Sequence, residues 1–230
     1  MSEQLRDEYL DKRIEMFDGW IREGKIPVSS KIIPVKQSLS GLQWVLPSEQ
    51  AREVLRNARS YALAHCDCRK RYVRCDNPTE VCFYLNDVAD KKSADGLARR
   101  VSLEEAEDRL RLANEYGLIH LTIYNPEQHV YALCSCCPCC CHDIAFMKQY
   151  NRPDMVAHSD YIAVTNRELC DNCGACDSRC AFGARSMVEG EMRYDQSKCF
   201  GCGLCVTSCP CGATSMMLRR LGKPGLLGRR

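Results

Sequence analysis

The sequence predicts an α+β protein, with a mostly helical, cysteine-rich N-terminal domain that contains a β-hairpin and a C-terminal module with pseudo-two-fold symmetry. Three observations predict this class. Apolar residues recur at helical spacing in three segments before residue 118. Two short apolar runs flank Asn125-Pro126 as in a hairpin. After Leu169 the chain repeats itself with an offset of 29 residues, which indicates two similar halves.

Composition excludes several classes of protein. The 230 residues are 45% hydrophobic and 27% charged, as in globular proteins. The net charge of +2, from 32 basic and 30 acidic side chains, favours neither nucleic acid nor an anionic membrane as partner. The oligomeric state leaves no signal in the sequence.

Cysteine is the unusual residue, with 19 copies gathered in four short stretches. An odd number in clusters is not a disulfide framework. The first residues lack the apolar segment of a signal peptide, and no uncharged apolar run reaches about 18 residues. We therefore expect no transmembrane segment and a cytoplasmic location, where thiols stay reduced and available as metal ligands.

The first predicted element is an amphipathic helix over residues 3–23, because Leu10, Ile14, Phe17 and Ile21 share one face. Pro27 and Pro34 then predict an extended connector. Residues 1–47 are expected to form this helix and connector.

The second predicted unit is the cysteine-rich helical and hairpin domain, residues 48–158. Ser48 caps a helix whose apolar face runs to Ala62 and leads to Cys66. Ser102 and Glu105 form a capping box for a helix that Gly117 closes. The hairpin strands are 118–123 and 130–133.

Helix followed by hairpin also ends winged-helix DNA-binding modules, so a redox-sensing DNA-binding regulator is a lesser alternative. The exposed side of the helix carries Glu104, Glu105, Glu107 and Asp108 against Arg109 and Arg111. Such a face repels phosphate rather than attracting it. We therefore expect no nucleic-acid partner.

The repeat after Leu169 aligns eight cysteines in two runs. Cys170, Cys173, Cys176 and Cys180 recur as Cys199, Cys202, Cys205 and Cys209. The C-x2-C-x2-C loop presents three thiolates to three irons of a cubane while its backbone N–H groups face the cluster sulfides. Structural zinc is the alternative, but it uses separated C-x2-C pairs rather than consecutive x2 steps.

These runs resemble the bacterial 2[4Fe–4S] ferredoxin family over residues 159–218, the third predicted domain. By that resemblance one cluster is held by Cys170, Cys173, Cys176 and Cys209, and the other by Cys199, Cys202, Cys205 and Cys180. The resemblance implies one-electron transfer. Two departures, Ala181 in place of the usual proline and the additional Cys211, remove no ligand.

Ten further cysteines form two groups, Cys66, Cys68, Cys75 and Cys82, and then Cys134, Cys136, Cys137, Cys139, Cys140 and Cys141. Arginine and lysine interleave with the first group and favour its thiolates. The second group cannot aim six thiols at one site, because successive side chains of an extended segment point to opposite sides. The ten are candidate ligands of one or two additional iron–sulfur clusters, and unligated reactive thiols are the alternative. The region is loosely similar to cysteine-rich segments of ferredoxin-domain proteins from anaerobic microbes.

The leading functional hypothesis is a multicluster iron–sulfur electron-transfer protein, a ferredoxin-like relay to or from a larger redox enzyme or another electron carrier. No nucleotide-binding fingerprint accompanies the clusters. The alternative is an iron–sulfur reductase with a substrate-reactive cluster at Cys134–Cys141, beside His142. An electron carrier or oxidoreductase subunit is expected more than a stand-alone enzyme.

The last predicted segment is a basic flexible tail, residues 219–230. It carries five of the six basic residues between 196 and 230, where no acidic residue occurs. Such an arm would steer an acidic face of a redox partner toward the second cysteine run.

Overall fold

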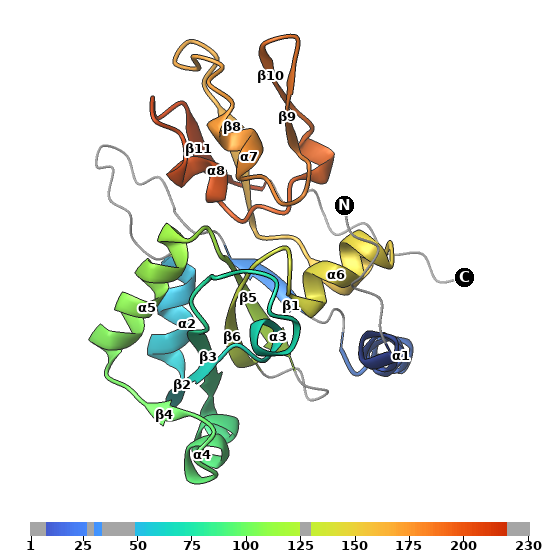
Figure 1. The fold of residues 1–230 in the computed structure, drawn as a ribbon, viewed down its shortest axis with the longest axis vertical. Helices are drawn as coiled ribbons and strands as arrows, with labels where there is room; N and C mark the ends of the chain where they lie inside the picture. Colours follow the sequence, from blue (N-terminus) through green and yellow to red (C-terminus); the bar gives the residue numbers. More distant parts are fainter. Residues whose placement is uncertain (1–7, 27–29, 34–48, 125–129, 220–230) are drawn as a thin grey trace.

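The computed structural model describes residues 8–26, 30–33, 49–124 and 130–219. Figure 1 shows two parts stacked along the long axis. The N-terminal region, residues 8–157, is built on a seven-stranded sheet, and the smaller C-terminal module comprises residues 158–219. Among the described residues, no helix combines the length and the apolar character needed to cross a membrane.

The sheet has the strand order β4-β2-β3-β6-β5-β1-β7. All neighbours are antiparallel except β1 and β7, which are parallel. The strands are β1 (Ser30–Ile33), β2 (Tyr61–His65), β3 (Glu80–Leu85), β4 (Arg99–Arg100), β5 (Ile119–Tyr124), β6 (Val130–Cys136) and β7 (Val156–Ala157). The predicted hairpin is present as β5 and β6, but both strands are interior, so the hairpin is not a free wing.

The expectation of a mostly helical domain with one hairpin is therefore wrong for the N-terminal region. The helix predicted from Ser48 to Ala62 ends at Asn57 as α2 (Glu49–Asn57), and Tyr61–His65 is strand β2. Alanine and leucine have high helix propensity, which hid this strand. Pairing with β3 and burial of Leu63 override that local preference. The connector also forms a strand, β1, at the far side of the sheet.

Helices lie on both faces of the sheet (Figure 1). They are α1 (Glu8–Arg22), α2, α3 (Asp67–Tyr72), α4 (Asn86–Ala94), α5 (Leu103–Glu115), α6 (His142–Gln149) and a 3-10 turn at Pro153–Met155. Ser102 Oγ accepts the N–H of Glu105 at 3.1 Å, as the predicted capping box requires. The first predicted helix forms over 8–22, and residues 1–7 lie outside the described residues.

Strand alternation divides the residues of the sheet between two faces. Phe83 and Leu85 of β3 and Leu133 of β6 pack with Leu55 and Leu110 beneath α2 and α5. The residues between them, including Cys82, Cys134 and Cys136, face the other side, where they line a cavity together with residues of α1, α3 and α6. The fold thus uses one face as an apolar core and the other as a cysteine-lined site.

The C-terminal module pairs its strands in two antiparallel ribbons, β8 with β11 and β9 with β10. Its elements are β8 (Tyr161–Thr165), α7 (Ala175–Ser178), β9 (Arg185–Val188), β10 (Glu191–Tyr194), a 3-10 turn (Gln196–Lys198), α8 (Leu204–Thr207) and β11 (Thr214–Leu218). Gly174 and Gly203 precede α7 and α8 with φ of 77° and 79°. Only glycine adopts this left-handed backbone without strain, so the repeat in sequence is also a repeat in local geometry.

A stack of rings within the module lies where the module meets the N-terminal region. Phe200 of the module stacks on His158 at 4.1 Å and on Phe182 at 4.7 Å between ring centroids. Ser159 N–H donates to Phe200 O at 2.9 Å. Phe200 and Leu204 belong to the same buried cluster as Ile119 and residues of α6 and β7. The module is therefore packed onto the N-terminal region.

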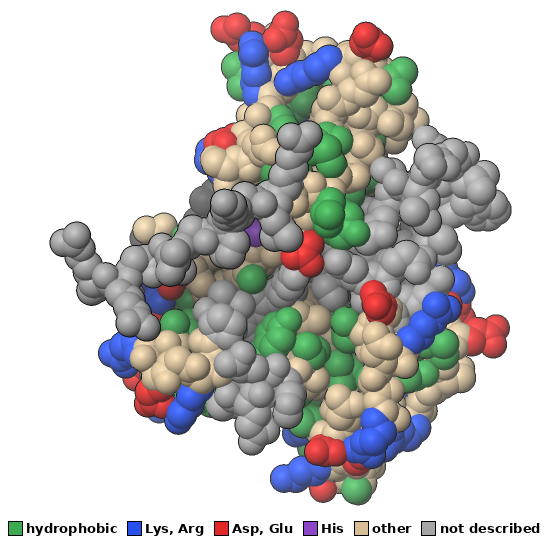
Figure 2. All heavy atoms as spheres, turned by 180° about the vertical axis from the view of Figure 1, so that it is seen from behind, with side chains coloured by type: hydrophobic (Ala, Val, Ile, Leu, Met, Phe, Trp, Pro, Cys, Tyr) green, Lys and Arg blue, Asp and Glu red, His purple; other side chains and the backbone are tan. Residues whose placement is uncertain are grey.

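Charge is mixed over the surface. Figure 2 shows acidic and basic side chains interspersed at both ends of the long axis on that face. Arg219, the first residue of the predicted tail, donates its Nε to Ser159 O at 3.0 Å and an Nη2 hydrogen bond to Cys199 O. Arg219 is thus anchored, contrary to its assignment to a flexible tail, and residues 220–230 lie outside the described residues.

Candidate metal centres

The eight cysteines of the repeat line two separate small cavities in the module. Site I is lined by Cys170, Cys173, Cys176 and Cys209, and site II by Cys180, Cys199, Cys202 and Cys205. Each site therefore takes three cysteines from one run and the fourth from the other run. The ferredoxin resemblance assigns these same four cysteines to each cluster, and their binding of a cluster stays a prediction. The additional Cys211 also lines site I, with its sulfur 3.6 Å from that of Cys209.

The donor sets of both sites fit an iron–sulfur cluster. The backbone N–H of Ala175 donates to the Cys173 thiol, and that of Leu204 donates to the Cys202 thiol at the equivalent position of the second run. Burial raises the pKa of Cys205 to about 12. A thiol buried in this way ionises only when a bound metal supplies positive charge.

A buried arginine lies between sites I and II. Arg185 lines both cavities and is 2% exposed. Its Nη1 donates to Cys176 Sγ at 3.8 Å and to Thr165 Oγ1 at 3.0 Å, and the guanidinium also donates to Cys205. Burial disfavours its charge, but the Cys205 and Cys176 sulfurs outweigh that cost and raise the pKa of Arg185. The charge thus sits where two anionic clusters would need compensation.

Sequence reasoning missed Arg185. A signal was present, because the repeat matches Gly183-Ala184 with Gly212-Ala213 and then breaks at the next position, where Arg185 corresponds to Thr214. A departure from an internal repeat beside metal ligands indicates a residue that serves both halves at once.

Six of the ten N-terminal cysteines form a closed ring on the cysteine-lined face of the sheet. We name this set the six-thiol ring: in order around it, Cys66, Cys68, Cys141, Cys136, Cys134 and Cys82, with each thiol hydrogen-bonded to the next. Cys134 and Cys136 are on the same side of β6, Cys82 is on β3, and Cys66 immediately precedes α3. The ring therefore depends on three segments of the chain.

The pKa values alternate around the six-thiol ring. Hydrogen bonds from neighbouring thiols lower the pKa of Cys134 to about 6, and lower those of Cys66 and Cys141 as well. The other three pKa values are raised because those thiols donate, and they belong to Cys68, Cys82 and Cys136. Hydrogen bonds between the thiols therefore stabilise at most three thiolates in the ring. Ionisation of all six thiols requires the positive charge of a bound metal.

A cavity of about 470 Å³ opens beside the six-thiol ring. Besides the thiols, its lining includes Tyr9 and Arg13 of α1, Tyr84, Lys92, Tyr131 and His142. His142 is 5% exposed, and its Nδ1 lies 3.4 Å from Cys68 Sγ. Its Nε2 is buried and has no hydrogen-bond partner among the described residues. Burial lowers the pKa of His142 to about 4, so its ring is neutral at pH 7.

The remaining four N-terminal cysteines form a second group, separate from the ring. We name Cys75, Cys137, Cys139 and Cys140 the four-thiol group, whose sulfurs all lie within 4.8 Å of one another. Cys75 comes from the loop between α3 and β3, and the others from the turn that follows β6. The cysteine run thus faces two sides, with Cys134, Cys136 and Cys141 on the ring and the three between them on the four-thiol group.

Arg69 is close to sulfurs of both the six-thiol ring and the four-thiol group. It is 3% exposed, and both of its terminal nitrogens donate to Ser135 O at 3.0 Å. Burial opposes its charge, while the sulfurs of Cys66, Cys82 and Cys137 favour it, so the pKa of Arg69 is raised. Arg69 thus serves the N-terminal sites as Arg185 serves sites I and II.

Comparison with known families identifies one part of the chain. Residues 169–213 match the model of the 4Fe–4S dicluster domain family, and all eight cysteines of sites I and II lie within the match. No curated protein matches the chain. The domain match and the cysteine content support an iron–sulfur electron-transfer protein.

Proposed function

We propose that the protein is an electron relay in which two [4Fe–4S] clusters at sites I and II exchange electrons with a metal centre held by the six-thiol ring. One observation carries this proposal. Cys202 of site II packs in the same buried cluster as Cys136 and Cys141 of the ring. A predicted ligand of the module and two thiols of the N-terminal region thus share one apolar cluster.

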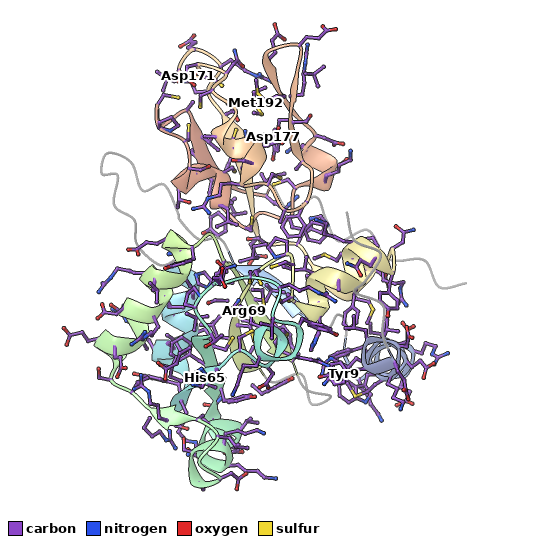
Figure 3. All side chains as sticks on the ribbon, viewed as in Figure 1. Tyr9, His65, Arg69, Asp171, Asp177 and Met192 are labelled. Carbon is purple, nitrogen blue, oxygen red and sulfur yellow. The ribbon has the colours of Figure 1, made fainter. Side chains whose placement is uncertain are left out.

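The chemistry that the clusters supply is the uptake and release of one electron each at low potential. The chain itself sets the order in which the sites follow one another. Asp171 of the site I loop lies at the end of the module far from Arg69 (Figure 3), whereas Phe200 and Leu204 beside site II contact the N-terminal region. Site II is therefore the inner site, between site I and the six-thiol ring.

Site I is the side from which a partner approaches in this proposal. Cys173 is exposed, whereas Cys199 and Cys205 of site II are buried. A redox enzyme or another electron carrier that docks at the outer end of the module comes close to site I without entering the N-terminal region. The proposed route runs from the partner to site I, then site II, then the ring.

The test uses the full chain, prepared without oxygen. Iron and sulfide analysis should exceed the eight irons of two cubanes, and reduction by dithionite should give EPR signals from sites I and II and from a further centre. Cys202→Ser should then slow reduction of the further centre by a reduced ferredoxin donor while its iron is retained. An unchanged rate would place the ring outside the relay.

A second candidate function is reduction of a substrate at the six-thiol ring. The cavity beside the ring and the unpartnered His142 Nε2 favour it, because chemistry at a metal centre needs open space and a proton-bearing neighbour. Burial raises the pKa of Tyr131 to about 12, so this phenol in the same lining keeps its proton. A disulfide is the substrate class proposed, and its conversion to two thiols consumes two electrons and two protons.

This candidate is tested by disulfide turnover with reduced ferredoxin as donor. His142→Asn should lower the rate at least tenfold with the iron content unchanged. Tyr116→Phe, a change at an exposed tyrosine of the loop after α5, is the control and should have no effect. No turnover of any disulfide tested would leave the relay as the function.

A further inference from the structure

The four-thiol group has the dimensions of a single-ion site. Cys75 Sγ lies 3.7 Å from Cys137 Sγ and 3.9 Å from Cys140 Sγ, and the sulfurs of Cys139 and Cys140 are 3.8 Å apart. Four sulfurs bound to one zinc ion at its usual bond length occupy a tetrahedron with edges of about 3.8 Å. These three separations match that edge, and all the sulfurs of the group lie within 4.8 Å of one another.

A cubane requires a wider arrangement. Its four thiolates bind four different irons, so the width of the cube adds to the separation of their sulfurs. Among the described residues, the four-thiol group is the one set whose ligand atoms all lie within 4.8 Å of one another. The thiols of sites I and II do not meet that limit, although they line common cavities. The same structure therefore distinguishes two kinds of cysteine site.

The surroundings of the four-thiol group are those of a closed structural site. Cys137 and Cys140 are buried, and the group packs against Val81, Ala113 and Leu118. Asn77 Nδ2 donates to Cys75 Sγ at 3.3 Å, and the backbone N–H groups of Asn77 and Arg74 donate to the sulfurs of Cys75 and Cys140. Such donors offset thiolate charge around a bound metal.

The loop that carries Cys75 begins with a residue in a strained backbone conformation. Val73 ends α3 in the left-handed region, with φ of 48° and ψ of 49°, and its side chain is 79% exposed. A β-branched residue rarely adopts this conformation, and no burial of Val73 offsets the strain. The bend brings Cys75 to Cys137, which follows it by 62 residues in the sequence. A metal ion bound by both segments would hold it.

We propose that Cys75, Cys137, Cys139 and Cys140 bind one zinc ion, which clamps the loop after α3 to the turn after β6. The ion takes no part in electron transfer, because zinc is not redox-active and four thiolates complete its coordination. Iron–sulfur chemistry is then confined to sites I and II and the six-thiol ring. The zinc site is independent of the relay function proposed above.

The test begins with the full-length wild-type protein expressed in medium containing both iron and zinc and purified without oxygen. Elemental analysis should give one zinc per chain in addition to the iron. X-ray absorption at the zinc edge should show four sulfur neighbours at about 2.3 Å and no neighbouring metal atom. A chain that contains iron alone, or zinc with nitrogen or oxygen ligands, would overturn the assignment.

Variants provide the second arm. Cys75→Ser should lose the zinc and keep the iron, whereas Asp76→Ser, at the exposed next position of the same loop, should keep both metals. Cys75→His should retain zinc, because three cysteines and one histidine are also a common zinc set. Loss of about four irons from Cys75→Ser with zinc absent from the wild type would show that the group holds a cubane.

Discussion

Cys136 and Cys137 are consecutive in the chain, yet their thiols belong to two different sites. Cys136, the last residue of β6, hydrogen-bonds to Cys134 and Cys141 in the six-thiol ring. Cys137 lies 3.7 Å from Cys75 in the four-thiol group. Both are buried, at 4% and 2% exposure, so a substitution at either one disturbs packing to a similar degree. The pair therefore offers a matched comparison of the two sites.

We predict that Cys136→Ser and Cys137→Ser affect different metals. Cys136→Ser should lower the iron content and leave one zinc per chain, because a serine hydroxyl is a poor substitute for a thiolate ligand. Cys137→Ser should lose zinc and retain the iron. Elemental analysis of both purified variants checks this. If either substitution removed both metals in equal proportion, the two groups would be a single site.

Arg185 is predicted to raise the reduction potentials of sites I and II. Its positive charge favours the reduced, more negative state of each cluster, and a hydrogen bond to a charged group is worth roughly 1.5 kcal/mol. Arg185→Gln should therefore lower both potentials by about 60 mV, the one-electron equivalent of that energy. A redox titration followed by EPR measures the shift.

Two further variants separate charge from packing at this position. Arg185→Lys keeps the positive charge, so the reduction potentials of sites I and II should stay close to those of the wild type. Arg193→Gln, in the same module but exposed and paired with Glu191, should change neither cluster. Equal potentials for wild type and Arg185→Gln would contradict the electrostatic role.

Gly201 is predicted to be required for the fit of the site II loop. A Cβ at this position would lie 2.0 Å from the backbone oxygen of Tyr161, and φ is +77°. Gly190, in the β9–β10 turn, has φ of +81° but open space around it. Gly190→Ala should cost about 1–2 kcal/mol from its backbone conformation alone. Gly201→Ala should cost more and should reduce the iron bound at site II.

Anaerobic urea unfolding and iron analysis of the two alanine variants check this prediction. The comparison isolates the steric term, because both glycines have the same left-handed backbone. Similar stability of the two variants would mean that the Tyr161 backbone moves away easily.

His120 is predicted to make stability fall as pH falls. It is a fully buried residue of strand β5, with Nε2 2.7 Å from Asn114 Oδ1 and Nδ1 3.0 Å from Ser135 Oγ. Burial lowers its pKa to about 4, whereas in the unfolded chain the value is about 6.5. Between these values the unfolded chain binds a proton that the folded chain does not, so acid favours unfolding.

The linkage predicts a loss of about 2 kcal/mol from this residue between pH 7.5 and pH 5.0. Wild type and His120→Gln should therefore differ in the pH dependence of their free energies of unfolding by that amount. Clusters in both proteins respond to acid equally, so the difference isolates His120. Parallel pH curves would show that the pKa of His120 is the same in the folded and unfolded states.

The sequence by itself determined the content of the C-terminal module. Spacing of two residues between cysteines is a local property, because a tight loop closes within a few residues and its geometry follows from glycines such as Gly174 and Gly203. The duplication then predicted two like sites. In the structure, the first three cysteines of each run line one cavity, and the fourth cysteine of the other run completes its lining. The α5 helix was predictable for the same reason, since Ser102 caps it through a contact three residues away.

Only the tertiary structure decided how the ten N-terminal cysteines are divided. Their partners are distant in sequence, as in the pair Cys75 and Cys137, and such contacts depend on how β3 and β6 pair in the sheet. The sheet itself was underestimated because β2 consists of residues with helical preference that are buried by strand pairing. Local sequence fixes which residues are close in the chain. The folded sheet decides which thiols share a metal, because ligand geometry is set by packing between segments.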